Sequence, residues 1–160
     1  VEAIIALHYV FESPKDKMVF DVSHQTYPHK MLTGRKDAYL YEEHYDDVTG
    51  YSCPEESEHD HFTIGHTSTS VSLACGLAKA RDLRGESGNV IAIIGDGSLS
   101  GGEALEGIDF AAETGRGFRF SHDPKLYAKS ALGNEWKYLQ EKYGYTKLDR
   151  KGEFWYAVKE

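Results

Sequence analysis

An aspartate between two glycines is the residue whose surroundings in this sequence point most directly to chemistry. The apolar run over 89–94 ends in Gly95-Asp96-Gly97, and a helical pattern of apolar residues follows. A strand, a glycine turn and a helix start form an anion cradle, because free N–H groups at a helix N-terminus attract negative charge. A carboxylate in that cradle would repel a phosphate unless a divalent cation lay between them. The turn therefore indicates binding of Mg²⁺ and a diphosphate, with Asp96 as the metal ligand.

Two other interpretations of this turn stay open. The first is a tight strand-to-helix connection in which Asp96 is simply solvated. The second is a nucleotide-binding module of another kind. That second interpretation rests only on the glycine turn, because Gly95, Gly97 and Gly101 give G-x-G-x-x-x-G and miss the dinucleotide pattern G-x-G-x-x-G.

Two upstream segments carry polar side chains that could join such a site. Ser23-His24-Gln25 follows the short apolar stretch 18–22, and ligands of open α/β sheets bind beyond the C-terminal ends of the strands. Gly65-His66 precedes a run of hydroxyl residues, 67–70, at the expected start of a helix. These hydroxyl groups form either a second anion cradle or ordinary N-caps.

The elements that must position these residues alternate along the chain. Apolar periodicity and turn residues predict a helix over 4–11, strands over 18–22, 62–64 and 89–94, and helices beginning near 70 and 100. This order indicates an α/β fold with a parallel sheet and helices on both faces. The strand over 89–94 should be buried on both faces.

Local signals refine the connections between these elements. Pro28 disfavours a helical conformation at Tyr27, so residues 27–30 should be extended or turned. The acidic stretch 37–61 should be a long loop. Ser100 and Glu103 have the spacing of a capping box that would start the last helix.

Composition limits the possible classes of function. The formal net charge of −8 argues against a nucleic-acid-binding surface, and no apolar run approaches membrane-spanning length. Cys53 and Cys75 provide no disulfide framework, so we expect a cytoplasmic protein. The chain lacks an initiator Met, and we expect a fragment or a processed product. Four histidines in or near the acidic stretch match no zinc-binding spacing: His44, His59, His61 and His66.

The last part of the chain has a different character. Residues 115–160 carry 10 Lys/Arg against 6 Asp/Glu, whereas residues 1–114 carry 8 against 20. We expect 1–114 to form the α/β core and 115–160 to be a basic, aromatic tail that packs on the same domain. Residues 154–158 have strand composition, for an edge strand or the start of a helix. An exposed apolar edge would favour self-association, so we expect a homo-oligomer.

Three segments, in this order and at these separations, resemble one known family. They are 21–30 (DVSHQTYPHK) with 32–35 (LTGR), 65–70 (GHTSTS), and 95–97 (GDG). They are similar to the N-terminal domain of 1-deoxy-D-xylulose-5-phosphate synthase, a transketolase-like thiamine diphosphate enzyme family, over about residues 1–114. The resemblance implies the thiamine diphosphate-binding fold, incomplete relative to the family. It also implies a transferase that condenses pyruvate with glyceraldehyde 3-phosphate, releases CO₂ and serves isoprenoid precursor synthesis.

The resemblance also implies roles for individual positions. His24 matches a histidine at the catalytic centre, and Asp96 would ligate Mg²⁺. The remaining matched positions would contact thiamine diphosphate: His66, Ser68, Thr69 and Ser70 in the second segment, and Gly95, Gly97 and Ser98 in the third.

The sequence departs from the family in two places. The family carries an Asn-Asp-Asn-like segment about two dozen residues after Gly-Asp-Gly, whereas residues 117–123 (GFRFSHD) contain no Asn, and Asp123 would have to substitute. The family's second domain, which supplies a Glu for the aminopyrimidine, has no room in 160 residues. The chain is therefore not catalytically complete alone. It is either one half of a split enzyme with a pyrimidine-binding partner chain, or a truncated, non-catalytic remnant or interaction module that keeps the α/β core.

Overall fold

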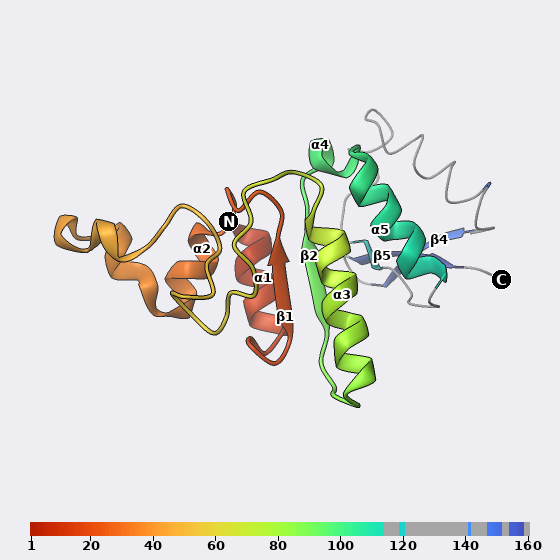
Figure 1. Cartoon of the computed structure of the whole chain (residues 1–160), viewed down its shortest axis with the longest axis horizontal. Helices are drawn as coiled ribbons and strands as arrows, with labels where there is room; N and C mark the ends of the chain where they lie inside the picture. Colours follow the sequence, from red (N-terminus) through yellow and green to blue (C-terminus); the bar gives the residue numbers. More distant parts are fainter. Residues whose placement is uncertain (114–118, 121–140, 142–146, 152–153, 159–160) are drawn as a thin grey trace. The chain divides into compact units, whose positions relative to one another are not determined.

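The computed structural model describes residues 1–113, 119–120, 141, 147–151 and 154–158 (Figure 1). The chain divides into two compact units, residues 1–106 and residues 107–160. The packing of residues 115–160 on the core stays a prediction. None of the described helices has the length and apolar character that crossing a membrane requires.

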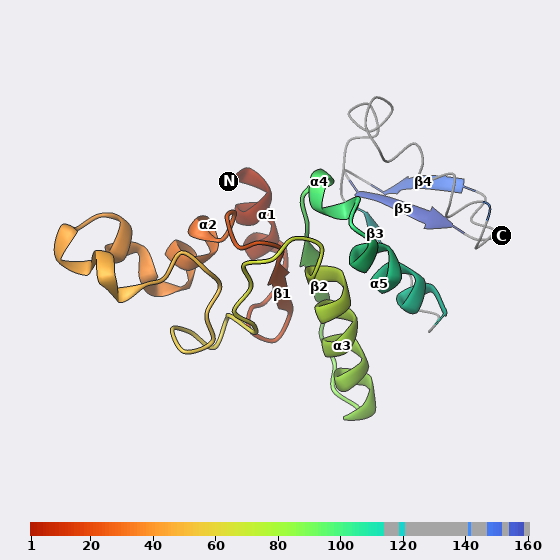
Figure 2. The same cartoon turned by 45° about the horizontal axis from the view of Figure 1, so that its top comes forward.

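The first unit is built on two parallel strands with a helix on each face. Strands β1 (Lys17–Phe20) and β2 (Val90–Ile93) pair in register from Lys17↔Val90 to Phe20↔Ile93. Helix α1 (Glu2–Val10) lies on one face and helix α3 (Ser70–Leu83) on the other, as the two views show (Figures 1 and 2). The predicted α/β fold, with a parallel sheet between helices, is confirmed.

Alternation along each strand divides the core into two clusters, because successive side chains of a strand point to opposite faces. The cluster on the α1 side contains Ile4, Met18 and Phe20, with Leu7, Phe11, Ile91 and Ile93 packed against them. The cluster on the α3 side contains Val19, Ile64 and Ala74, with Phe62, Leu73, Leu77, Val90 and Ala92 packed against them. Each strand therefore contributes side chains to both clusters.

The sheet of the first unit is incomplete relative to the family. Among the described residues β2 pairs only with β1, and all four of its residues are partly exposed. Both faces of this strand pack against a helix, as predicted, but its residues are only partly buried, because no described strand pairs with its other edge. Self-association through such an edge stays a prediction.

Residues 27–30 are helical, which corrects the prediction of an extended or turned segment. Helix α2 (Tyr27–Lys30) has the N-cap Thr26, and Pro28 is its second residue, within the first turn. Proline is tolerated there because a first-turn N–H has no intrahelical partner to lose. The first-turn position of Pro28 therefore outweighs its effect on Tyr27.

Short helical turns follow α2 and partly organise the acidic stretch that was predicted to be one long loop. They are η1 (Met31–Arg35), η2 (Lys36–Tyr39) and η3 (Glu42–Asp47). The predicted strand over 62–64 is wrong, since only Ile64 pairs, through a single antiparallel bridge with Ser52. The carbonyl oxygen of Ile64 instead accepts a hydrogen bond from the Ser23 hydroxyl.

Two helices follow β2. The short α4 (Asp96–Leu99) comes first, and α5 (Gly102–Glu113) follows it. The predicted capping box is wrong, because α5 begins at Gly102, one residue too late for Ser100 to be its N-cap, and the Ser100 hydroxyl donates instead to the carbonyl oxygen of Gly97 at 2.7 Å. The predicted inner face of α5 is buried at Ala104, Ile108 and Ala111.

The second unit contains an antiparallel sheet in the order β3-β5-β4. Its strands are β3 (Arg119–Phe120), β4 (Lys147–Lys151) and β5 (Phe154–Val158). Residues 154–158 are thus a strand, but a central one, and the edge assignment is wrong. The segments 121–140 and 142–146, which include Asp123, lie outside the described residues.

Candidate functional site

Three loops that carry the predicted site residues meet beyond the C-terminal ends of β1 and β2. The strands are parallel, so the residues that follow Phe20 and Ile93 emerge at the same edge of the sheet. The N–H of Asp21 donates to the carbonyl oxygen of Ile93 at 2.8 Å, and Gln25 Nε2 donates to the same oxygen at 3.3 Å. The loop that bears His24 is therefore tied directly to the start of the loop that bears Asp96.

A wholly buried aspartate at the end of β1 holds the second loop. The carboxylate of Asp21 accepts the N–H of Ser68 at 3.1 Å and the N–H of Ser70 at 3.0 Å. These N–H groups belong to the segment whose hydroxyl groups were predicted to form a second anion cradle or N-caps, and the N-cap residue Thr69 makes no side-chain capping bond. An internal carboxylate thus caps α3, with the charge sign that a helix N-terminus favours.

The second loop is tied in turn to the loop after β2. The Ser68 hydroxyl donates to the carbonyl oxygen of Ser98 at 2.6 Å, and Ser68 itself has a left-handed φ of 71°. A Cβ atom on Gly101 would lie 1.9 Å from Ser68 Oγ, so this close approach requires glycine. Segments 65–70 and 95–101 are therefore fitted to one another.

The predicted site residues differ in their exposure to solvent. The exposed residues are His24, His66, Asp96 and Gly97, the partly exposed ones are Thr69, Gly95 and Ser98, and the buried ones are Ser68 and Ser70. His66 Nδ1 lies 2.7 Å from the carbonyl oxygen of Thr67. Nδ1 must donate there, so Nε2 of a neutral His66 remains an acceptor.

The surroundings of Asp96 fit a magnesium ion that a diphosphate shares. Its carboxylate is exposed at the end of β2, and a Cβ atom on Gly95 or Gly97 would meet nothing within 4 Å. Within the described part of the chain, no group of three or more His, Cys, Asp or Glu residues could hold a metal alone. Magnesium is commonly held by one or two carboxylates together with phosphate oxygens and water, so a single carboxylate beside an open turn is consistent with such an ion.

Comparison with known proteins decides the family. The profile of the 1-deoxy-D-xylulose-5-phosphate synthase family matches residues 1–119. This chain belongs to that family. It corresponds to an N-terminal segment of the synthase, and the match contains all three loops described above.

Several bacterial 1-deoxy-D-xylulose-5-phosphate synthases are similar to this chain. That of Dictyoglomus turgidum is 53% identical over 109 residues, covering 68% of this chain and 18% of its own length. Those of Symbiobacterium thermophilum and Heliobacterium modesticaldum are each 53% identical, over 111 and 115 residues, covering 69% and 72% of this chain and 17% and 18% of their own lengths. The chain thus spans less than a fifth of the length of these synthases.

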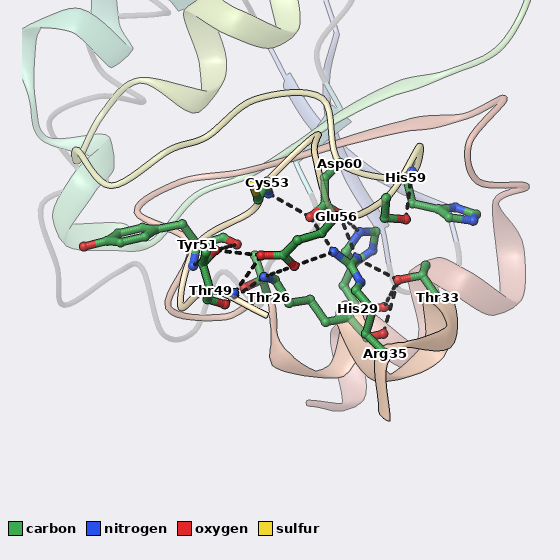
Figure 3. Close-up of polar contacts among 12 residues, drawn as sticks. Thr26, His29, Thr33, Arg35, Thr49, Tyr51, Cys53, Glu56, His59 and Asp60 are labelled. Atoms are coloured by element: carbon green, nitrogen blue, oxygen red, sulfur yellow. Dashed lines mark hydrogen bonds and ion pairs between the residues drawn. The ribbon is translucent and has the colours of Figure 1, made fainter. Parts of the chain in front are cut away.

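The synthase segment also contains a buried charged network that the sequence did not predict (Figure 3). Asp60 is at its centre, with no exposed side-chain area. Its carboxylate accepts hydrogen bonds from both terminal nitrogens of Arg35, at 2.8 and 2.9 Å, and from His29 Nε2 at 2.9 Å. The N–H of Cys53 donates to it as well, at 2.8 Å.

A second carboxylate extends this network. Glu56 accepts from Lys30 Nζ at 2.6 Å and from Arg35 Nη1 at 3.1 Å. Lys30 is fully buried, and its Nζ also donates to the carbonyl oxygen of Thr49 at 2.8 Å. Both cations of this network follow shortly after His24, so the network holds α2 and η1 against residues 49–60.

The network reaches α1 through two imidazoles. His8 Nε2 lies 2.8 Å from His29 Nδ1. If His29 is neutral and donates from Nε2 to Asp60, its Nδ1 must accept from His8. Burial lowers the pKa of His8, and the neighbouring His29 and His59 lower it further.

The histidines considered for zinc do not converge within the described structure. His59 Nδ1 lies 2.8 Å from the Ser13 hydroxyl, His44 pairs with Asp47, and His66 bonds to its neighbour's carbonyl. The residues of the acidic stretch that do join a buried cluster are the carboxylates Glu56 and Asp60. Their cationic partners lie 21 to 26 residues away in the chain, at Lys30 and Arg35.

Proposed function

We propose that this chain binds Mg²⁺ and the diphosphate of thiamine diphosphate at the loops beyond β1 and β2. It would be the diphosphate-binding portion of a 1-deoxy-D-xylulose-5-phosphate synthase, the transferase that joins pyruvate to glyceraldehyde 3-phosphate for isoprenoid precursor synthesis. The main support for this proposal is the Ser68–Ser98 hydrogen bond, because it holds the segment that contains His66 against the turn that contains Asp96. Family membership supports it independently.

Each exposed residue has a role in this proposal. Asp96 supplies the protein oxygen to Mg²⁺, and the open backbone of Gly95 and Gly97 lets the diphosphate approach closely. His66 and His24 project from the neighbouring loops, where His24 would face the reacting centre. The bound cofactor would supply a nucleophilic thiazolium carbon, and this chain would orient and neutralise the diphosphate end.

The site is proposed to be completed by another polypeptide. The chain spans only 17–18% of the length of the synthases it matches. We propose that a pyrimidine-binding partner chain holds the other end of the cofactor. The two-stranded sheet of the described first unit is compatible with a second candidate, a non-catalytic remnant that keeps the α/β core. The two candidates differ in whether Asp96 still holds a metal ion.

Replacing Asp96 by asparagine distinguishes these candidates. We expect Asp96→Asn to weaken Mg²⁺-dependent thiamine diphosphate binding at least about tenfold, because a neutral amide oxygen attracts a hard divalent cation less than a carboxylate does. Titration calorimetry measures the affinity, and thermal unfolding checks that the fold is intact. Asp37→Asn, at an exposed aspartate in η2, is the control and should bind like the unaltered chain. Equal affinities in all three proteins would contradict the metal role of Asp96 and favour the remnant.

A further inference from the structure

We propose that Asp21 is a positioning residue that sets where the Asp96 turn lies, acting through Ser68 and Ser98. This inference rests on the proposed function, because the turn is the proposed metal site. We call these three residues the Asp21 clamp. Asp21 touches no proposed ligand, since it is fully buried below the loops.

The position of Asp21 is fixed by the sheet. It directly follows β1, and its N–H bonds to the carbonyl oxygen of Ile93 at 2.8 Å, which continues the pairing of the strands by one residue. The chain then turns sharply, with left-handed φ values of 61° at Val22 and 74° at Ser23. Such backbone angles persist in non-glycine residues only where the surroundings impose them. The carboxylate is therefore held at the C-terminal ends of the two strands.

The carboxylate imposes the conformation of the second loop. Each of its oxygens accepts one backbone N–H, from Ser68 and from Ser70. Ser68 has a left-handed φ of 71°, and the carbonyl oxygens of its neighbours Thr67 and Thr69 already accept hydrogen bonds, from His66 Nδ1 and from the N–H of Leu73. A carboxylate offers one oxygen to each N–H group, whereas an asparagine in its place would set a donor NH₂ group against one of them.

A hydrogen bond from the second loop holds the turn after β2 in place. Ser68 Oγ donates to the carbonyl oxygen of Ser98, two residues after Asp96, at 2.6 Å. A methyl group on Gly101 would meet Ser68 Oγ at 1.9 Å, so the two segments have little room to shift. A displacement of Ser68 therefore has to move the turn or break the bond.

Amide hydrogen exchange on the full chain, without cofactor, tests the clamp directly. Asp21→Asn should speed exchange about tenfold at Ser68, Ser70 and over 96–100, since about one hydrogen bond is lost at each junction. Ser68→Ala should speed exchange only over 96–100, and Gly101→Ala should reproduce that pattern by displacing the hydroxyl. Exchange in the middle of β1 and β2 should stay unchanged.

Asp16→Asn is the matched control. Asp16 is also buried, and it accepts the N–H groups of Asn89 and Glu12 at the opposite end of the same two strands. Its replacement should leave exchange over 96–100 unchanged. The clamp is refuted if Asp21→Asn speeds exchange evenly across both strands, or leaves 96–100 at the rate of the unaltered chain. If Asp21→Asn does not fold, Ser68→Ala and Gly101→Ala decide, and unchanged exchange over 96–100 in both refutes the clamp.

Cofactor titration separates this inference from the proposed function. If the unaltered chain binds Mg²⁺ and thiamine diphosphate, Ser68→Ala should lower the affinity about tenfold, the equivalent of one lost hydrogen bond. Unaltered affinity in Ser68→Ala, despite faster exchange over 96–100, would overturn the positioning role. If the unaltered chain does not bind, the proposed function fails, and the exchange experiment still decides whether the clamp exists.

Discussion

Replacing Asp60 by alanine is expected to lower the free energy of unfolding by about 3–5 kcal/mol, the usual cost of breaking a buried ion pair from one side. Asp60 has no exposed side-chain area and accepts four hydrogen bonds, two of them from Arg35. Its removal leaves the guanidinium of Arg35 with Glu56 as its remaining carboxylate partner. It also leaves His29 Nε2 and the N–H of Cys53 without their acceptor.

The exposed pair between His44 and Asp47 is the matched control for Asp60. It shares the histidine–carboxylate contact of His29 and Asp60, with Nδ1 of His44 2.8 Å from the carboxylate, but its side chains are 44% and 65% exposed. Solvent-exposed ion pairs contribute about 0–1 kcal/mol, so Asp47→Ala should cost no more than that. Urea denaturation of both variants measures the difference at constant m-value. Similar costs for the two replacements would mean that the network does not hold residues 49–60 in place.

Acidification is expected to destabilise the chain in two stages, the first of which begins below about pH 6.5. Burial lowers the pKa of His8, His59 and His61 from the ordinary value of 6.5. A histidine with a lowered pKa is neutral in the fold while the unfolded chain already takes up a proton. Its contribution to stability is therefore present above 6.5 and is lost as the pH falls below that value.

The second stage comes from the buried carboxylates. Burial alone would raise the pKa of Asp60, but the hydrogen bonds from Arg35, His29 and the N–H of Cys53 outweigh it and hold that pKa well below 3.8. The pKa of Glu56 is also lowered, because Lys30 and Thr49 outweigh the effect of burial. Carboxylates with lowered pKa values contribute their full stabilisation above their unfolded pKa of about 4, and this contribution is lost progressively as the pH falls from there through the lower pKa of the folded state.

Urea denaturation at a series of pH values measures both stages. His8→Phe should reduce the loss of stability in the first stage, because it removes one neutral imidazole and keeps an aromatic ring beside His29. His44→Phe, at a half-exposed histidine outside the network, should leave the first stage as it is. A stability that stays constant down to about pH 5 would contradict the assignment of neutral, buried histidines.

The fold of the core could be predicted because its signals are local. The β-branched run over 90–93 and the apolar stretch before Asp21 have the composition of strands, and the helices between them make a parallel pair the expected solution. Residues 27–30 could not be assigned in this way, because two rules about Pro28 conflict. In the structure these residues are helical, because the first turn of a helix tolerates a missing N–H group.

The buried polar groups could not be predicted because their partners are distant in the sequence. In the sequence, Asp21 looks like the end of a strand. The residues whose N–H groups donate to its carboxylate, Ser68 and Ser70, lie 47 and 49 residues later in the chain. Glu56 and Asp60 read as part of a solvated acidic loop, and only folding brings them to Lys30 and Arg35. The candidate ligand residues Asp96 and His66 were found from their motifs, whereas the residues that position them became visible only in three dimensions.

Binding of the cofactor's diphosphate end by this chain alone is the central claim, and one calorimetric experiment tests it most directly. The full chain is titrated with thiamine diphosphate, with inorganic diphosphate and with thiamine, each with and without Mg²⁺. We predict Mg²⁺-dependent binding of thiamine diphosphate and of inorganic diphosphate at the same site, and no binding of thiamine, because in the proposed site Asp96 and its open glycine turn would contact only the diphosphate end. Absence of binding for both diphosphates, or equal binding of thiamine without the metal, would contradict the claim.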